Sequence, residues 1–443
     1  MSKELYKLTE QSLNGQNEVF CPAPFFHMYV HSSELPKVCC AFSNQSYYTK
    51  KDVVELVKSS PNRELTTEWK NDYYKNIRTD ILNGKKVKGC TRCYQTERFG
   101  GYSDRIIHNE KLQKYLKQNS EKNINLDIEN GSSLGSPINL DLRPGNLCNL
   151  QCRMCGPGSS TQLNKEWKKL PKSWNLNGFD ERRIKNWSSD ENLEFLLRNI
   201  DSTGMIKFLG GEPTIMPEVH KIMDHLIENN LTDVELFFTS NLTNNNAKFL
   251  DKIKKFKKIK IAISADGIGK VLEYIRHPIH WDTFKDNISK YSMIDSVENN
   301  FDIQYTIQAY NIHNILPTLK WIRDFKNEGK LGDKMIYFSP EVLEFPEYLS
   351  FKMLPKWYRD YHIQKCLRHP IMKEDFVTSY GRTVEHLERM LNNKDEPDTV
   401  EFIEHTAKLD ISRNQHIKDY LPELYDIYRN DYIEIRKKLE DDE

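Results

Sequence analysis

Residues 146–156 read NLCNLQCRMCG and place three thiols, those of Cys148, Cys152 and Cys155, in a C-x3-C-x2-C array. The residues just before them, 138–142, read INLDL and alternate apolar with polar side chains, which is typical of a β-strand. The sequence therefore predicts a strand that ends in a loop carrying three cysteines.

Three thiolates on one loop are one ligand short of a closed metal site. Cysteine thiolates select zinc or iron–sulfur clusters, and closed sites of either kind use four protein ligands. If all three bind one cubane cluster, one iron keeps an open coordination position, which is a mark of metal sites that bind or activate a ligand. The alternative is a C-x2-C half of a zinc site with a third cysteine beside it by chance.

This array after a first strand resembles the signature of the radical S-adenosylmethionine (radical SAM) enzymes. The resemblance implies a [4Fe–4S] cluster on Cys148, Cys152 and Cys155 whose open iron chelates the amino and carboxylate groups of S-adenosylmethionine. It also implies the chemistry: one electron cleaves the sulfonium to methionine and a 5′-deoxyadenosyl radical, which abstracts hydrogen from a substrate.

Strand and helix patterns alternate from about residue 137 to 345. Strands are predicted at 138–143, 205–209, 234–239, 259–264, 301–307 and 335–339, with amphipathic stretches between them at 191–200, 218–229, 247–256, 284–293 and 315–326. Alternation of this kind indicates a parallel sheet built of βα units. Six units predict an α/β fold with an open, partial (β/α)6, TIM-like barrel, whose chemistry lies at the C-terminal ends of the strands.

The resemblance extends to the residues that follow these strands. Gly210, Gly211 and Glu212, with Pro213, match the family's GGEP motif. The glycines would let backbone approach the cofactor, and a backbone carbonyl or the Glu212 carboxylate would accept from the methionine ammonium. A glycine turn at the end of a strand is the plainer interpretation.

Polar residues after the next two strands extend the predicted cofactor site. Ser240 and Asn241 resemble the family's Thr-Asn-Gly cluster, with Leu242 where glycine is usual, and are expected near ribose or adenine unless they only cap a turn. Ser264 and Asp266 resemble the SxDG step that touches the ribose. Residues 274–276, Tyr-Ile-Arg, resemble the family's YxR-like segment, which implies that Arg276 pairs with the methionine carboxylate unless it is an ordinary surface arginine. A guanidinium fork fits a carboxylate bidentately.

A second group of cysteines lies in the N-terminal segment. Cys21 opens the run CPAPF, Cys39 and Cys40 are adjacent, and Cys90 and Cys93 form a C-x2-C after a predicted helix at 65–83. We expect residues 27–31 and 38–40 to form a hairpin around a turn at 35–37, with Cys21 and the Cys39–Cys40 pair on its two strands. Four thiols, from Cys21, Cys39 or Cys40, Cys90 and Cys93, make a closed site for zinc or for an iron–sulfur cluster.

This cysteine pattern resembles the SPASM and twitch modules that accompany many radical SAM enzymes. The resemblance implies an auxiliary iron–sulfur cluster, most simply [4Fe–4S]. Two departures stand out: the pattern precedes the core instead of following it, and its cysteines suffice for one cluster, as in the shorter twitch module. Whichever of Cys39 and Cys40 is not a ligand is expected to be a buried bystander.

The chain is therefore divided into four predicted segments. Residues 1–118 form the auxiliary-cluster module, 119–136 a linker, 137–345 the radical SAM core, and 346–443 a helical C-terminal segment. Cys366 stands alone in the last segment and is expected to be a small buried hydrophobe.

Composition limits the partners. The 443 residues include 64 basic and 64 acidic ones, so no long-range basic field favours nucleic acid. The N-terminus has no apolar signal segment, and no run of about 18 apolar residues predicts a membrane span. Nine clustered cysteines suit metal binding in a reducing compartment, so we expect a cytoplasmic protein without a membrane partner.

The substrate is the least defined part of the prediction. Radical SAM enzymes with SPASM or twitch modules often modify peptides or proteins, so the resemblance implies a peptide first and a small molecule, such as a sugar or nucleotide, second. An electron donor such as flavodoxin or ferredoxin would be required. A different class also fits the cysteines: a zinc-stabilised binding protein in which no radical forms.

Overall fold

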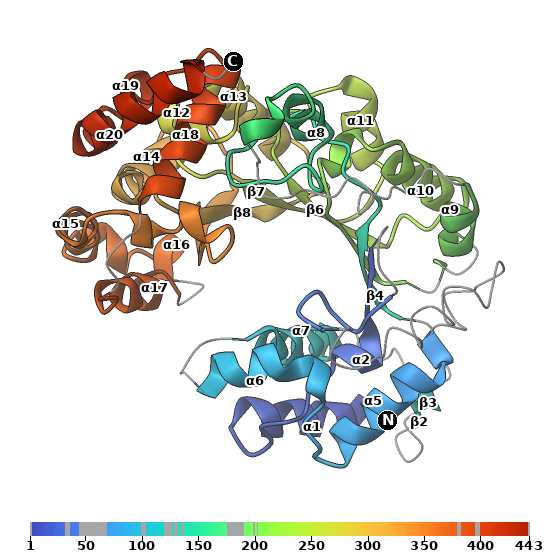
Figure 1. The fold of residues 1–443 in the computed structure, drawn as a ribbon. Helices are drawn as coiled ribbons and strands as arrows, with labels where there is room; N and C mark the ends of the chain where they lie inside the picture. The colour runs from blue at the N-terminus through green and yellow to red at the C-terminus, as the bar shows by residue number, and fades with distance from the viewer. Residues whose placement is uncertain are drawn as a thin grey trace. The chain divides into compact units, whose positions relative to one another are not determined.

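The fold is built on a seven-stranded sheet with the strand order β1-β4-β5-β6-β7-β8-β9 (Figure 1). The computed structural model describes residues 2–31, 36–43, 69–98, 103–118, 126–127, 132–133, 137–174, 190–197, 200–201, 203–378, 382–394 and 399–441. The strands are β1 (His27–His31), β4 (Asn139–Arg143), β5 (Met205–Phe208), β6 (Glu235–Ser240), β7 (Ile259–Ser264), β8 (Val297–Ile307) and β9 (Met335–Val342). Pairs β1–β4, β4–β5, β7–β8 and β8–β9 are parallel. The predicted α/β class with a parallel sheet is confirmed, and all six predicted strands are present.

Strand β1 corrects the N-terminal prediction. The expected hairpin is present only as one isolated antiparallel bridge between Tyr29 and Lys37, and part of its predicted turn lies outside the described residues. Its second strand is wrong, because residues 38–40 form bends and a turn, and β1 pairs along its length with the parallel strand β4. The register places Met28 and Val30 of β1 opposite Leu140 and Leu142 of β4, so the pairing buries two apolar rows on one face, which a lone hairpin cannot do.

The chain forms two compact units. The first comprises Met1–Gly145, Lys185–Leu209 and Pro217–Leu236, and the second comprises Asn146–Ile184, Gly210–Met216 and Phe237–Glu443. Strands β1, β4 and β5 belong to the first unit, β7, β8 and β9 belong to the second, and β6 contributes residues to both. The predicted segment boundaries near 118, 136 and 345 stay predictions.

The first unit contains several helices in addition to strands β1, β4 and β5. They are α1 (Ser2–Leu13), α2 (Ala23–Phe26), α5 (Asp72–Leu82), α6 (Thr91–Arg98), α7 (Asp104–Gln118), α9 (Asp190–Leu197) and α10 (Pro217–Glu228), and a short pair of strands, β2 (Leu126–Asp127) and β3 (Ser132–Ser133), also belongs to it. Helix α5 begins where Asn71 caps it by accepting from the Tyr74 N–H. Its buried Arg78 donates to the carbonyls of Pro24 and Trp69, which anchors α5 beside the segment that carries Cys21.

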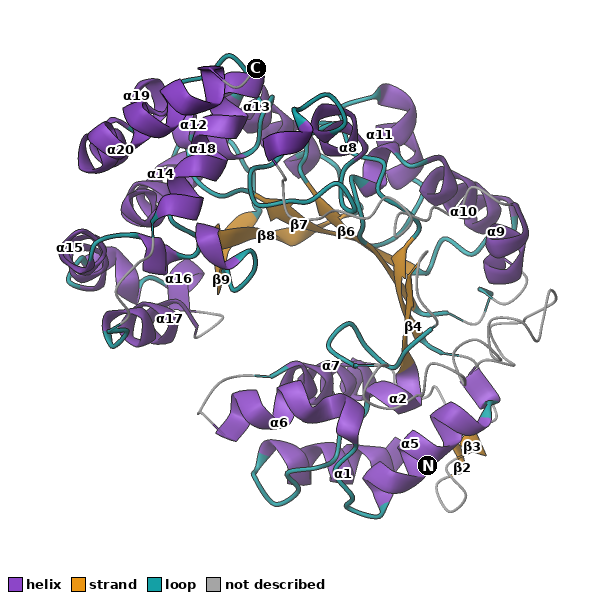
Figure 2. Ribbon diagram, in the orientation of Figure 1, coloured by secondary structure: helices purple, strands orange, loops and turns teal. Residues whose placement is uncertain are grey.

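The second unit contains the remaining helices. They are α8 (Thr161–Trp167), α11 (Ala247–Ile253), α12 (Gly269–Ile275), α13 (Trp281–Ser292), α14 (Ile315–Asn327), α15 (Lys356–Leu367), α16 (Asp375–Thr378), α17 (Arg382–Leu391), α18 (Val400–Ser412), α19 (Ile417–Tyr420) and α20 (Pro422–Asp441). Helices α12 to α14 lie on the outer side of β7 to β9 (Figure 2). Helices α16 and α17 contact the terminal strand β9, which protects its edge. The predicted helical C-terminal segment is confirmed.

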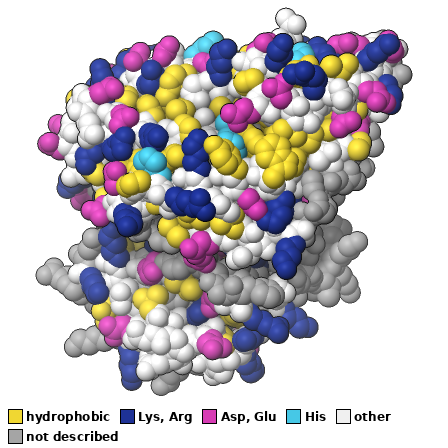
Figure 3. All heavy atoms as spheres, turned by 90° about the vertical axis from the view of Figure 1, so that its left-hand side faces the viewer, with side chains coloured by type: hydrophobic (Ala, Val, Ile, Leu, Met, Phe, Trp, Pro, Cys, Tyr) yellow, Lys and Arg dark blue, Asp and Glu magenta, His cyan; other side chains and the backbone are white. Residues whose placement is uncertain are grey.

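Charges of both signs share the surface. On the face drawn in Figure 3, Lys and Arg side chains are interspersed with Asp and Glu, in keeping with the equal numbers of basic and acidic residues. Across the parts of the chain that the structure describes, none of the helices combines the length and the apolar character that crossing a bilayer requires.

Shortening a buried side chain of β8 tests whether this strand lies in the core of the second unit. Ile303 of β8 has no exposed surface, and its strand pairs on both sides, so Ile303→Ala should lower the free energy of unfolding by about 2–5 kcal/mol. Urea denaturation followed by circular dichroism measures this. Asn300→Ala, at an exposed position of the same strand, should change stability by less than about 0.5 kcal/mol. Equal losses in the two variants would contradict the burial assigned to β8.

Candidate functional site

The cysteine loop, residues 144–160, is closed by contacts with the start of α8. The Thr161 N–H donates to the Asn146 carbonyl at 2.9 Å, and the Ser160 hydroxyl donates to the Leu150 carbonyl at 2.6 Å. Ser160 also caps α8, because its hydroxyl oxygen accepts from two backbone N–H groups of the first turn. The loop that carries Cys148, Cys152 and Cys155 is thus tied to the helix that follows it.

The GGEP segment packs directly on the cysteine loop. The Glu212 N–H donates to the Leu147 carbonyl at 2.7 Å, and a Cβ on Gly211 would lie 2.2 Å from the same carbonyl oxygen. Gly210 has a φ of 117°, a left-handed conformation that favours glycine. Both glycines of the predicted motif are therefore required by backbone geometry, and Gly211 is required by a close approach to the cysteine loop.

The Glu212 carboxylate joins two of the predicted cofactor segments. Oε1 accepts from the hydroxyls of Thr214 at 2.6 Å and Ser240 at 2.8 Å, and Oε2 accepts from the Asn241 N–H at 2.7 Å. Burial raises the pKa of Glu212, and these donors oppose that rise. Ser240, expected near ribose or adenine, thus donates to Glu212. Through this bond and the bond from the Asn241 N–H, the Glu212 carboxylate holds the end of β6 against the GGEP segment.

Asn241 extends this network to the cysteine loop. Its Nδ2 donates to the Asn149 side-chain oxygen at 3.0 Å and lies 4.0 Å from the Cys148 sulfur. The next residue, Leu242, has a φ of 56° and is fully buried. A non-glycine residue in the left-handed region carries backbone strain, and it stands where the resemblance led us to expect glycine.

Asp266 and Arg276 form a buried ion pair beside Cys152. The Arg276 Nε lies 2.7 Å from Asp266 Oδ2, and its Nη1 lies 3.8 Å from the Cys152 sulfur. Asp266 also accepts from the Thr306 N–H at 2.8 Å. Burial works against the charged guanidinium, but Asp266 and Cys152 outweigh it, so the pKa of Arg276 is raised. Ser264, at the end of β7, is half-buried.

The three thiols of the cysteine loop influence one another. Burial and then the Cys152 thiol raise the pKa of Cys148 to about 12. The hydrogen bond between Cys155 and Cys152 lowers the pKa of Cys152, to which Arg276 contributes, and raises that of Cys155. Three neighbouring thiols beside a guanidinium suit a metal cluster, because coordination removes the proton from each thiol.

The N-terminal cysteines lie in the first unit. Cys21, Cys39, Cys90 and Cys93 line one small cavity together with Tyr94. Burial raises the pKa of Cys21, to which Cys90 and Cys93 add, and burial raises the pKa of Cys39, to which Cys40 and then Cys21 add. Within the described ranges, no three His, Cys, Asp or Glu side chains converge closely enough for a single metal ion.

One expectation about this region needs correction. Cys40 is exposed, not buried, and it is absent from the lining of the cavity that holds Cys39. Arg105 also lines this cavity, and its guanidinium pairs with Glu97 and donates to the Phe20 carbonyl at 3.0 Å, so it fastens α7 next to Cys21. Most of the predicted linker, residues 119–136, lies outside the described residues.

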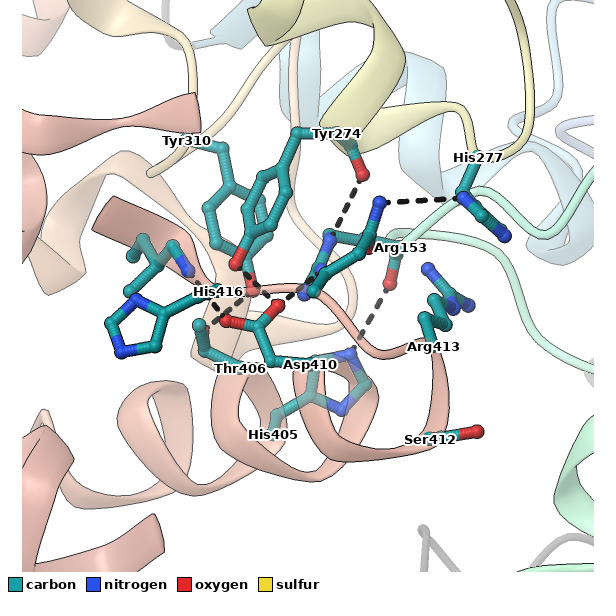
Figure 4. Close-up of polar contacts among 12 residues, drawn as sticks. Arg153, Tyr274, His277, Tyr310, His405, Thr406, Asp410, Ser412, Arg413 and His416 are labelled. Atoms are coloured by element: carbon teal, nitrogen blue, oxygen red, sulfur yellow. Dashed lines mark hydrogen bonds and ion pairs between the residues drawn. The ribbon is translucent and has the colours of Figure 1, made fainter. Parts of the chain in front are cut away.

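Arg153 and Asp410 form a buried pair that we did not predict. Arg153 lies within the cysteine motif, and its guanidinium bonds the Asp410 carboxylate of α18 (Figure 4). The signal available in the sequence was the arginine itself, because a charge in a tight, cysteine-bearing loop needs a partner when buried. Cys366, in contrast, is buried as expected.

The close approach of Gly211 leads to a prediction. Gly211→Ala would overlap the Leu147 backbone, which cannot move away as a flexible side chain can. We expect the free energy of unfolding to fall by about 1–3 kcal/mol, measured by urea denaturation, and iron binding by the displaced cysteine loop to weaken. Gly156→Ala is the control, because Gly156 lies on the same loop, has an ordinary φ and leaves open space where a methyl group would stand. Similar behaviour of both variants would contradict the packing described here.

The cysteine loop and the motif residues around it lie in a part of the chain that matches a known protein family. Residues 142–322 match the family model of the radical SAM superfamily, and no curated protein matches the chain. Similar solved structures include Streptococcus suis SuiB bound to S-adenosylmethionine (16% identity, 65% of this chain, 63% of that chain, TM-score 0.34) and anSMEcpe with bound AdoMet and Cp18Cys peptide (14%, 60%, 65%, 0.34). The match thus spans less than two thirds of either. Residues 142–322 therefore form a radical SAM domain, in agreement with the family that the cysteine motif resembles.

Proposed function

We propose that the chain is a radical SAM enzyme in which Cys148, Cys152 and Cys155 hold a [4Fe–4S] cluster. The cluster would supply the electron that cleaves S-adenosylmethionine to a 5′-deoxyadenosyl radical, which takes a hydrogen atom from the substrate. The observation that carries the proposal is the set of three thiols on one loop, with the Arg276 guanidinium 3.8 Å from the Cys152 sulfur. Three thiols leave one position for the cofactor.

The chain's own residues have separate roles in this proposal. Arg276 binds the methionine carboxylate, and Asp266 orients its guanidinium from the buried side. Glu212 holds Ser240 and Asn241 in place, and the remaining lone pairs of its Oε2 accept from the methionine ammonium. Ser264, after β7, contacts the ribose.

We propose in addition that Cys21, Cys39, Cys90 and Cys93 hold an auxiliary [4Fe–4S] cluster in an N-terminal module of residues 1–118. Their common cavity supports the ligand set, and the exposure of Cys40 supports Cys39 as the ligand from the adjacent pair. A cubane is larger than one ion and therefore takes thiols that stand further apart than zinc ligands do. Four protein ligands close this cluster, so its role is to transfer an electron or to brace the site.

The substrate class rests on the sequence resemblance alone. A peptide or protein is the first hypothesis and a small molecule such as a sugar or nucleotide is the second. Flavodoxin or ferredoxin would donate the electron, in a cytoplasmic setting.

The radical chemistry is tested by product formation. After anaerobic reconstitution, the protein with dithionite and S-adenosylmethionine should form 5′-deoxyadenosine, detected by liquid chromatography and mass spectrometry. The Cys148→Ala/Cys152→Ala/Cys155→Ala variant should form none, because it lacks all three ligands. Cys366→Ala is the matched control, since this cysteine is also buried but lies outside both cysteine groups, with its sulfur 3.6 Å from that of Met372. A fully iron-loaded protein that neither forms product nor binds S-adenosylmethionine would overturn the proposal.

The auxiliary site is tested in the triple-alanine variant, which isolates it. That variant should retain about four irons per chain and a brown colour, as one cubane requires. Adding Cys39→Ala should remove this iron, whereas adding Cys40→Ala should leave it, because Cys40 does not line the cavity. Metal analysis and visible absorbance measure both. One zinc per chain without visible absorbance would identify a structural zinc site instead.

A further inference from the structure

Arg153 is a charged residue enclosed within the cysteine loop. It lies between Cys152 and Cys155 in the sequence and is 1% exposed. A buried guanidinium needs an acidic partner and hydrogen-bond acceptors, because its desolvation is costly. Its Nη2 donates to Asp410 Oδ1 at 2.5 Å and to Gln415 Oε1 at 2.9 Å, and both acceptors come from the C-terminal helical region.

Asp410 gathers donors from four parts of the second unit. Besides Arg153, Oδ1 accepts from the Tyr274 hydroxyl at 2.8 Å, and Oδ2 accepts from the Tyr432 hydroxyl at 2.7 Å and the Ile417 N–H at 2.8 Å. The carboxylate is completely buried. Helix α18 therefore presents one fully bonded carboxylate to the cysteine loop, to α12, to α19 and to α20.

The Arg153 side chain also packs on Tyr274, the residue whose hydroxyl donates to Asp410. Its Cζ lies 3.5 Å from the centre of the Tyr274 ring, a cation–π contact, and its Nε donates to the Tyr274 carbonyl at 2.9 Å. The His405 Nε2 lies 3.3 Å from the Arg153 carbonyl, so α18 contacts the loop backbone as well. Figure 4 shows the guanidinium between Tyr274 and Asp410.

This cluster leads to the residues proposed to bind the cofactor. The cysteine loop runs alongside the end of α12: the Arg153 N–H donates to the Ile275 carbonyl at 2.8 Å, and the Gln151 N–H donates to the His277 carbonyl at 2.6 Å. Cys152 lies between these two contacts on the loop, and Arg276 lies between them on the other segment. The side chains of Cys152 and Arg276 are the ones that approach each other.

We propose that Asp410 is a positioning residue of the cofactor site, which holds Arg153 and Tyr274 and thereby sets Cys152 against Arg276. The C-terminal helices are then part of the radical SAM site and not an independent cover. This inference rests on the proposed function. It assigns to Asp410 no contact with cluster or cofactor.

The test compares Asp410→Asn with the wild-type protein after anaerobic reconstitution. Affinity for S-adenosylmethionine should fall about 10–100-fold, as is usual when a group supporting a metal site is lost, while the iron content stays unchanged. The change that S-adenosylmethionine causes in the electron paramagnetic resonance spectrum of the reduced protein should be lost at concentrations that saturate the wild type. A purely structural role would leave this spectroscopic response intact in the folded fraction.

Glu166→Gln is the matched control. Glu166 and Arg413 form another buried ion pair that joins α8 to the end of α18, with Nε and Oε1 2.8 Å apart, but it does not contact Tyr274 or Arg153 in the hydrogen bonds of the described residues. This variant should lose thermal stability. Its affinity for S-adenosylmethionine should stay within about twofold of wild type, because the hydrogen bonds among Arg153, Tyr274 and Asp410 are unchanged.

A double variant keeps the inference testable if Asp410→Asn does not fold. Arg153→Met/Asp410→Leu replaces the ion pair with apolar side chains, which often restores or raises stability. Recovery of the melting temperature without recovery of cofactor affinity would support positioning. Wild-type affinity in the double variant, or in folded Asp410→Asn, would overturn it. Absence of binding by the wild-type protein itself would overturn the proposed function instead, so the two failures are distinguishable.

Discussion

The approach of Gly211 to the Leu147 carbonyl is the constraint on which the site depends. Only a residue without a Cβ allows the Glu212 N–H to reach that carbonyl, and this hydrogen bond places the Glu212 carboxylate beneath Ser240 and Asn241. Asn241 then reaches Asn149 on the cysteine loop. Three motifs far apart in the sequence are thus joined by hydrogen bonds between protein atoms alone. The geometry of the three thiols follows from backbone contacts, which are less adjustable than side-chain contacts.

The second unit also buries three arginines around the cysteine loop, each beside its own carboxylate: Arg153 with Asp410, Arg276 with Asp266, and Arg413 with Glu166. Desolvation makes each charge expensive alone, so each pair is effectively neutral to its surroundings. Arg276 differs from the other two because its guanidinium also faces a cysteine sulfur. Among these three, Arg276 is therefore the cation in closest contact with the proposed cluster ligands, in agreement with the role proposed for it.

Much of this arrangement is predictable from sequence, and the parts that are not have physical causes. Alternating side chains identified all six strands of the core, and motif residues after strands came together because parallel strands end on the same side. The hairpin around residues 35–37 is reduced to the bridge between Tyr29 and Lys37, because local turn residues indicate a near partner but burial of Met28 and Val30 favours extended pairing with distant β4. The sequence could not show which of Cys39 and Cys40 lines the cavity, because the side chains of adjacent residues point in different directions. Asp410 lies 257 residues from Arg153 in an ordinary helical pattern, so nothing local marked it.

That separation has a consequence for the order of events during synthesis. Chains are made at about 5–20 residues per second, so roughly 10–50 s pass between the appearance of Arg153 and that of Asp410 on the ribosome. During this interval the arginine has no carboxylate, and the cysteine loop lacks its contacts with α18 and with Gln415. Helix α18 emerges well after the loop that it contacts. Insertion of the proposed cluster into the thiols would therefore have a window on the growing chain, before Asp410 engages Arg153.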